Sequence, residues 1–172
     1  MIHLENIDQI ALRRWITSGL QISEVRSLNG DAGYLFSNMI AKYTLAASEY
    51  RISAKALAWF HTNRIDLSAE YARSRFYGKD SSLMYEHSIP ASIIRKILLD
   101  SDPSEASVQN VLQGSGYVVV VMRDEDIALR SQGLTRKMPD TWHFGDNPFA
   151  RYDASGIELS DDFLKVKGKI KR

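Results

Sequence analysis

The segment "YVVVVM", residues 117–122, constrains the fold of this chain more than any other. It is continuously apolar and rich in β-branched residues, which is typical of a strand buried on both faces. Such a strand must be covered by other elements. We therefore predict a small sheet in the second half of the chain, with residues 117–122 at or near its centre and residues 83–89 as the partner strand.

The first part of the chain has a helical pattern. Residues 4–18 carry apolar side chains at i, i+3 and i+4, which predicts an amphipathic helix. The expected core face consists of Ile7, Ile10, Ala11, Trp15 and Ile16. Residues 31–63 continue the helical pattern with a bend expected near "YRIS", and residues 68–78 predict a short helix capped by Ser68.

Beyond residue 78 the pattern becomes mixed. Helices are expected after Pro90, at "SDPSEASVQNVL" with Asp102 as N-cap, at "RDEDIALRSQG", and at "NPFARYDASG" with Asn147 as N-cap. The tail "KVKGKIKR" is expected to fray. These patterns predict an α+β fold with a helical N-terminal region at residues 1–78 and an α+β region at residues 79–172, or one single domain.

Composition excludes several classes of site. The chain has no cysteine, which excludes disulfides, zinc–thiolate sites and thiol nucleophiles. Its formal net charge is only +1, so nucleic acid would have to be attracted by a local patch. The N-terminus lacks a signal-peptide pattern, and no apolar run reaches the roughly 20 residues that span a bilayer. We expect a cytoplasmic protein with no membrane partner.

Glu86 and His87 stand at the end of a short apolar strand and form the first candidate site. A carboxylate can hold a divalent cation, and a histidine can remove a proton near neutral pH. Adjacent side chains on a strand point to opposite faces, so both serve one site only near a strand end or a bulge. The alternative is a partly buried histidine that bonds a backbone carbonyl, with Glu86 paired to a nearby arginine.

The stretch "YEHSIP" resembles the first strand of HNH-type endonucleases, in which an acid and a histidine precede a proline. The resemblance covers residues 85–129 and continues through Asn110, the strand "YVVVVM" and the helix "RDEDIAL". It implies a nuclease with one divalent metal ion such as Mg²⁺. In that family the closing helix supplies a histidine, and here its nearest candidates are Glu125 and Asp126. The implied metal ligands are therefore Glu86 and Asp126.

The segment "GLTRKMPDTWHFGDNPFARY" interleaves basic and aromatic residues, a pattern that suits phosphates and stacked bases. A second such segment is "EYARSRFYGK". The candidate nucleic-acid-binding residues are Arg136, Lys137, Trp142, Tyr152, Arg73 and Arg75. The alternatives are a loop anchored by its apolar side chains and an ordinary amphipathic helix, both with solvated basic residues.

Two functional hypotheses follow. The first is a nuclease-like protein with His87 as general base and with Arg151 or Arg136 neutralising charge on the phosphate. Without a metal ion it would be a ribonuclease whose nucleophile is the 2′-hydroxyl. The second is a non-catalytic binding or regulatory module that engages a protein or nucleic-acid partner. The near-neutral charge and the missing closing histidine favour the second hypothesis, whereas the Glu-His pair before a proline and the strand–helix order after it favour the first.

Overall fold

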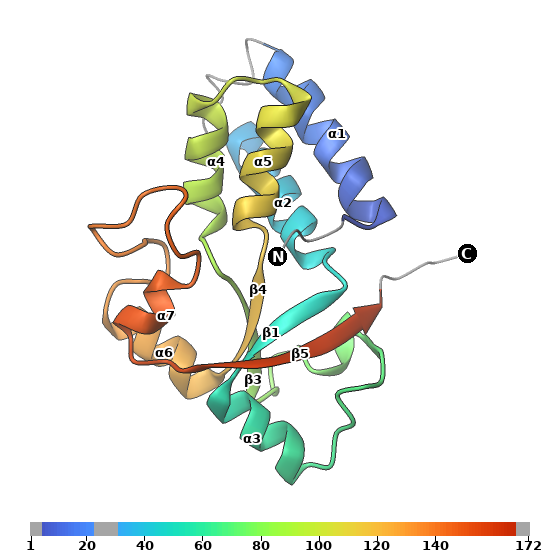
Figure 1. Ribbon diagram of the computed structural model, residues 1–172, viewed down its shortest axis with the longest axis vertical. Helices are drawn as coiled ribbons and strands as arrows, with labels where there is room; N and C mark the ends of the chain where they lie inside the picture. Colours follow the sequence, from blue (N-terminus) through green and yellow to red (C-terminus); the bar gives the residue numbers. More distant parts are fainter. Residues whose placement is uncertain (1–4, 23–30, 168–172) are drawn as a thin grey trace.

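The computed structural model describes residues 5–22 and 31–167 and contains a five-stranded sheet (Figure 1). The strands lie in the order β2, β5, β1, β4, β3. Their bounds are β1 Glu49–Ser53, β2 Tyr71–Ala72, β3 Leu83–His87, β4 Val118–Met122 and β5 Leu159–Lys167. Strand β4 runs parallel to β1, whereas β3 runs antiparallel to β4 and β5 antiparallel to β1. The predicted α+β fold class is confirmed.

Strand β4 lies inside the sheet, as its sequence predicts. Its four valines, residues 118–121, are at most 1% exposed, because strands cover both edges and side chains cover both faces. The predicted partner β3 lies beside it, with Glu86 opposite Val119 and His87 opposite Val118. Both strand predictions are confirmed.

The parallel strands β1 and β4 each lead directly into a helix, α3 (Ala54–Thr62) and α6 (Arg123–Ser131). Buried polar groups join the two strand–helix corners. The Ser53 hydroxyl accepts a hydrogen bond from the Ala56 amide and donates to Glu125 Oε2 at 2.6 Å. Glu125 also accepts from the Met122 amide. These bonds satisfy amides at both helix starts and link the two corners to each other.

The two faces of the sheet pack against different helices. On one face, called the α3 face here, Ile52 packs in a core with Phe60 of α3. On the other, the α6 face, Val121 packs in a core with Leu129 of α6 and with the short helix α7 (Ala150–Ala154). Because side chains alternate along a strand, neighbouring residues of β3 are divided between the two faces.

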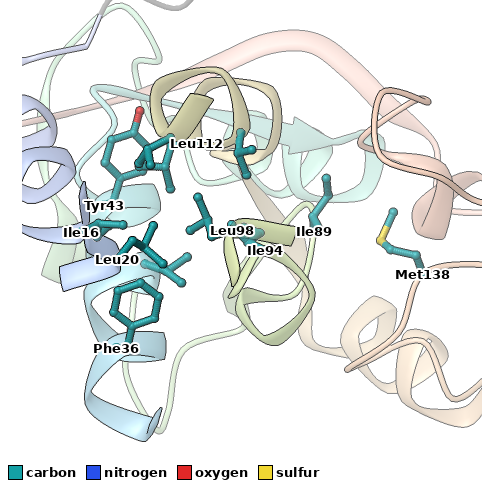
Figure 2. Packing of buried hydrophobic residues seen from close by; sticks show 12 residues of the cluster. Ile16, Leu20, Phe36, Tyr43, Ile89, Ile94, Leu98, Leu112 and Met138 are labelled. Atoms are coloured by element: carbon teal, nitrogen blue, oxygen red, sulfur yellow. The ribbon is translucent and has the colours of Figure 1, made fainter. Parts of the chain in front are cut away.

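Four helices gather beside the end of the sheet and bury a separate core (Figure 1). They are α1 Ile7–Gln21, α2 Asp31–Leu45, α4 Ala91–Asp100 and α5 Glu105–Ser115. Figure 2 shows Ile16, Phe36 and Leu98 meeting in this core, with Ile89 and Met138 at its edge. No helix within the described segments is long and apolar enough to cross a membrane.

Two helix predictions are wrong. The predicted helix over residues 31–63 is two helices, α2 and α3, separated by β1, because Tyr50 and Ile52 alternate into the core of the α3 face. The predicted helix over residues 68–78 is strand β2 followed by a 3₁₀ turn, Arg73–Arg75. Phe76 anchors this segment by packing its ring against Phe60.

The core face of α1 also differs from the prediction. Ile7 is 82% and Trp15 70% exposed, whereas Gln9 and Arg13 are buried. Arg13 turns inward because it pairs with Glu5 at 2.9 Å and also with Glu105 of α5. The predicted bounds of residues 4–18 also shift, since α1 begins at Ile7 after the N-cap Asn6 and ends at Gln21. Residue 4 itself lies outside the described residues.

Three predicted termini change as well. Ser104 caps α5 in place of Asp102, and α7 begins at Ala150 rather than directly after Asn147. The start of the tail "KVKGKIKR" belongs to β5, which lies between β2 and β1. Leu164 and Val166 alternate into the core, so the exposed Lys165 between them does not prevent a strand. The rest of the tail lies outside the described residues.

Candidate functional site

Strand β3 places the two residues of the first candidate site on opposite faces of the sheet. Glu86 points to the α6 face, where its Oε2 accepts a hydrogen bond from Arg151 at 2.9 Å. His87 points to the α3 face and lines a pocket together with Tyr85. No bulge lies between them, since both pair in continuous register with β4. The structure therefore does not bring Glu86 and His87 into one cavity.

Arg151 is a buried structural residue, only 1% exposed. Its guanidinium donates to the carbonyl oxygens of Leu134, at 2.9 Å, and of His87, and to the Tyr152 hydroxyl. Burial raises the pKa of Glu86, although the Arg151 charge opposes this. Arg151 thus holds the end of β3 against α7 through its two terminal nitrogens, while its buried Nε has no hydrogen-bond partner among the described residues.

The donor set around Glu86 does not match a metal centre. Asp126 is buried nearby on α6, but its carboxylate pairs with Arg130 at 3.1 Å, as Glu86 pairs with Arg151. Within residues 5–22 and 31–167, no three His, Asp or Glu side chains form a group able to hold a metal ion. The two carboxylates would have to leave their arginines to bind a divalent cation, and such a cation stays a prediction.

His87 belongs to a pocket of about 430 Å³ that we call the tyrosine pocket. It is built on the α3 face between the C-terminal end of α2, the strands β1 and β3, and the segment after β2. Its lining residues are Lys42, Leu45, Tyr50, Arg73, Ser74, Tyr77, Tyr85 and His87. Segments distant in the sequence thus converge on one cavity.

The tyrosines are held by specific contacts. The Tyr50 hydroxyl donates to the Leu45 carbonyl at 2.7 Å, and its ring meets the Tyr85 ring edge-on at 5.0 Å between centroids. Tyr77 stacks on Tyr85 at 5.6 Å. Burial raises the pKa of Tyr50 to about 12 and raises that of Tyr85 as well. The hydroxyls of Tyr50 and Tyr85 therefore stay protonated near pH 7, and that of Tyr85 still has its hydrogen to donate.

The charge in the tyrosine pocket is positive. Lys42 and Arg73 line it, and its described lining includes no Asp or Glu. Three buried polar atoms of the lining have no hydrogen-bond partner among the described residues: Arg73 Nε, Tyr85 Oη and His87 Nδ1. A buried polar atom without a partner is costly, so a ligand that supplies partners gains free energy there.

His87 is neutral at pH 7 in this setting. Burial, with a smaller contribution from the nearby Arg151 charge, lowers its pKa to about 4. The neutral ring has one donor and one acceptor nitrogen. His87 can therefore accept a proton or a hydrogen bond from a molecule in the tyrosine pocket.

The other candidate residues lie in different surroundings. Arg136 and Lys137 are exposed in the loop between α6 and α7. Trp142 is half-buried against the helical core and donates to the Asn147 carbonyl at 3.0 Å. Tyr152 is fully buried and has no face for a base.

Of the two arginines in the earlier segment, only Arg73 lines the tyrosine pocket. Arg75 lies over the Tyr71 ring at 5.2 Å. The basic and aromatic candidates thus do not form one continuous set around His87.

Sequence reasoning missed Lys42, Tyr50, Tyr77 and Tyr85 as site residues. One signal was present: in "YEH", the alternation along a strand places Tyr85 on the same face as His87. Comparison of the chain with family models, curated proteins and solved structures finds no match in any of the three. The likeness to HNH-type endonucleases therefore depends on residues 85–129 alone.

Proposed function

We propose that this protein binds nucleic acid and that the tyrosine pocket holds a phosphate of the strand. The supporting observation is the lining: two cationic side chains line a cavity that no described acid lines, and three of the lining residues each carry a buried polar atom without a described partner. Arg73 is the central residue, since its unpaired Nε–H is an obligate donor and phosphate oxygens are strong acceptors. This is the binding-module hypothesis with a defined site.

Size and charge are consistent with such a ligand. The pocket volume of about 430 Å³ lies within the ~300–1,000 Å³ range typical of small-ligand sites, enough for part of a nucleotide. The net charge of +1 gives no general attraction to a polyanion. Binding would therefore depend strongly on the local cations Lys42 and Arg73.

Fluorescence anisotropy with labelled single-stranded and duplex oligonucleotides tests this proposal. Affinity should fall with added salt, with a slope of about 0.7 per neutralised phosphate on single strands. Arg73→Gln should weaken binding by roughly 10-fold or more, because a hydrogen bond to a charged group is worth about 1.5–3 kcal/mol. Lys96→Gln, which removes an exposed charge on α4, is the matched control. Equal effects of both substitutions, or no binding at low salt, would refute the proposal.

A second candidate function is metal-independent cleavage of RNA, favoured by the neutral His87 in the lining of the tyrosine pocket. In this reaction neutral His87 removes the proton of a 2′-hydroxyl, and the 2′-oxygen bonds to phosphorus. The bond to the 5′-oxygen breaks, and that oxygen takes a proton from solvent. Arg73 stabilises the charge that develops on the phosphate. A base with a pKa near 4 is weak, so we expect slow turnover.

Incubation of an RNA oligonucleotide with EDTA tests this second candidate. Wild type should release a product ending in a 2′,3′-cyclic phosphate, while His87→Ala and a 2′-O-methyl substrate should give none. Cleavage that needs added Mg²⁺ and disappears in Glu86→Gln would favour the metal-dependent form instead. Absence of cleavage both with EDTA and with added Mg²⁺ would rule out both forms of cleavage and leave nucleic-acid binding as the proposed function.

A further inference from the structure

Tyr77 carries an exposed aromatic face above the tyrosine pocket. Its ring stacks on Tyr85 with centroids 5.6 Å apart and planes inclined by 23°. Tyr77 is 59% exposed, whereas the Tyr85 hydroxyl is buried. The two rings thus form a stack whose inner member lies in the sheet and whose outer member faces solvent.

The inner ring of the stack, Tyr85, is held in place by the sheet and by Tyr50. Tyr85 belongs to β3 and pairs with Val120 of the buried strand β4. Tyr50 meets the Tyr85 ring edge-on at 5.0 Å, and its own hydroxyl is tied to the Leu45 carbonyl. A ring held in this way needs little further ordering when another ring stacks on it.

We infer that the strand held in the tyrosine pocket is single-stranded and that one unpaired base stacks on the outer face of Tyr77. This inference rests on the proposed function. Arg73 and Tyr77 line the same pocket, so a phosphate at Arg73 places a covalently linked base within the same site. Bases inside a duplex have both faces covered by their neighbours. Only unpaired bases or strand ends offer a face to an aromatic side chain.

The test uses a short single strand with 2-aminopurine at one position, the same strand with an abasic site there, and the duplex. Wild type should quench 2-aminopurine fluorescence and prefer the single strand. Tyr77→Ala should weaken single-strand binding by roughly 5- to 150-fold, the range expected for one stacked base. Tyr77→Phe keeps the ring and should stay within about threefold of wild type. Tyr34→Ala, at a tyrosine 70% exposed on α2, is the control.

The abasic strand provides a second, independent readout. It should weaken binding to wild type but not to Tyr77→Ala, because that variant has already lost the stacking partner. If Tyr77→Ala bound the single strand as tightly as wild type while Arg73→Gln lost binding, the stacking inference would be overturned and the phosphate site would stand. Equal affinity for duplex and single strand would overturn it too. No binding to any strand would overturn both proposals. Melting curves of each variant separate lost binding from lost folding.

Discussion

At the scale of single residues, Arg151 shows that a buried charged side chain can have a structural role where its sequence context suggests ligand binding. The sequence places it in a basic, aromatic segment, which suggested contact with a phosphate. Its guanidinium instead bonds Glu86 and backbone carbonyls on the α6 face. A basic residue in a loop–helix segment cannot be assigned to solvent or core from its neighbours alone, because the partner Glu86 lies 65 positions away.

Replacing Arg151 should therefore impair folding. Arg151→Met leaves the Glu86 carboxylate buried without its partner, and removing one member of a buried ion pair costs about 3–5 kcal/mol. Urea denaturation followed by circular dichroism measures this loss. Arg136→Met, at an exposed position of the same loop, should change stability by less than about 0.5 kcal/mol. The double variant Glu86→Gln/Arg151→Met should recover part of the loss. A single Arg151→Met variant as stable as wild type would contradict the role given to the pair.

His87 should make stability depend on pH. Its pKa is lowered from 6.5 to about 4, first by burial and then by Arg151, so the folded protein binds fewer protons there than the unfolded chain. Its contribution to stability is therefore present above pH 6.5 and is lost as the pH falls toward 4. Between pH 7.5 and 5.0, wild type should lose roughly 1–2 kcal/mol more than His87→Gln, since one pKa unit corresponds to about 1.4 kcal/mol. Parallel urea titrations of both proteins measure the difference, and identical losses would show that His87 is not buried in its neutral form.

At the scale of elements, the sequence predicted those whose signals are local. The valine run of β4, Pro90 before α4 and the acidic start of α6 each define an element without reference to the rest of the chain. Strand β1 was missed because five residues between two helix-forming segments become a strand only through pairing with β4 and β5. The buried face of α1 was missed for a related reason: Arg13 is inside only because Glu5 and Glu105 meet it there.

The candidate site likewise has one part that local sequence predicts and one part that depends on distant segments. The chemistry of His87 could be anticipated from its residue type and its place at the end of a strand. The residues around His87 could not be anticipated, because the tyrosine pocket is formed by the end of α2, two strands and the segment after β2. The predicted partnership of Glu86 with His87 depended on a distorted strand end. The regular register of β3 with β4 removes that possibility, since regular pleating separates adjacent side chains.

At the scale of the whole molecule, the path of the chain joins the helical core to the core of the α3 face, which is called the sheet core below. Strands β3 and β4 are hydrogen-bonded neighbours, yet the chain between them passes through α4 and α5 in the helical core. Strand β1, from the first half of the sequence, lies between β4 and β5 from the second half. Neither core is built from a single continuous segment, so unfolding of one core would also disturb strands or helices of the other.

We therefore expect one cooperative unfolding transition. Leu98→Ala in the helical core and Leu83→Ala in the sheet core remove fully buried side chains, and each should cost about 2–5 kcal/mol. Trp142 packs on the helical core and Trp59 on the sheet core, so variants retaining only one tryptophan report on each core separately. Both reporters should give the same urea midpoint, and either leucine substitution should lower both midpoints equally, as a two-state transition requires. If Leu98→Ala lowered the Trp142 midpoint and left that of Trp59 unchanged, the helical and sheet cores would be separate folding units despite the shared chain path.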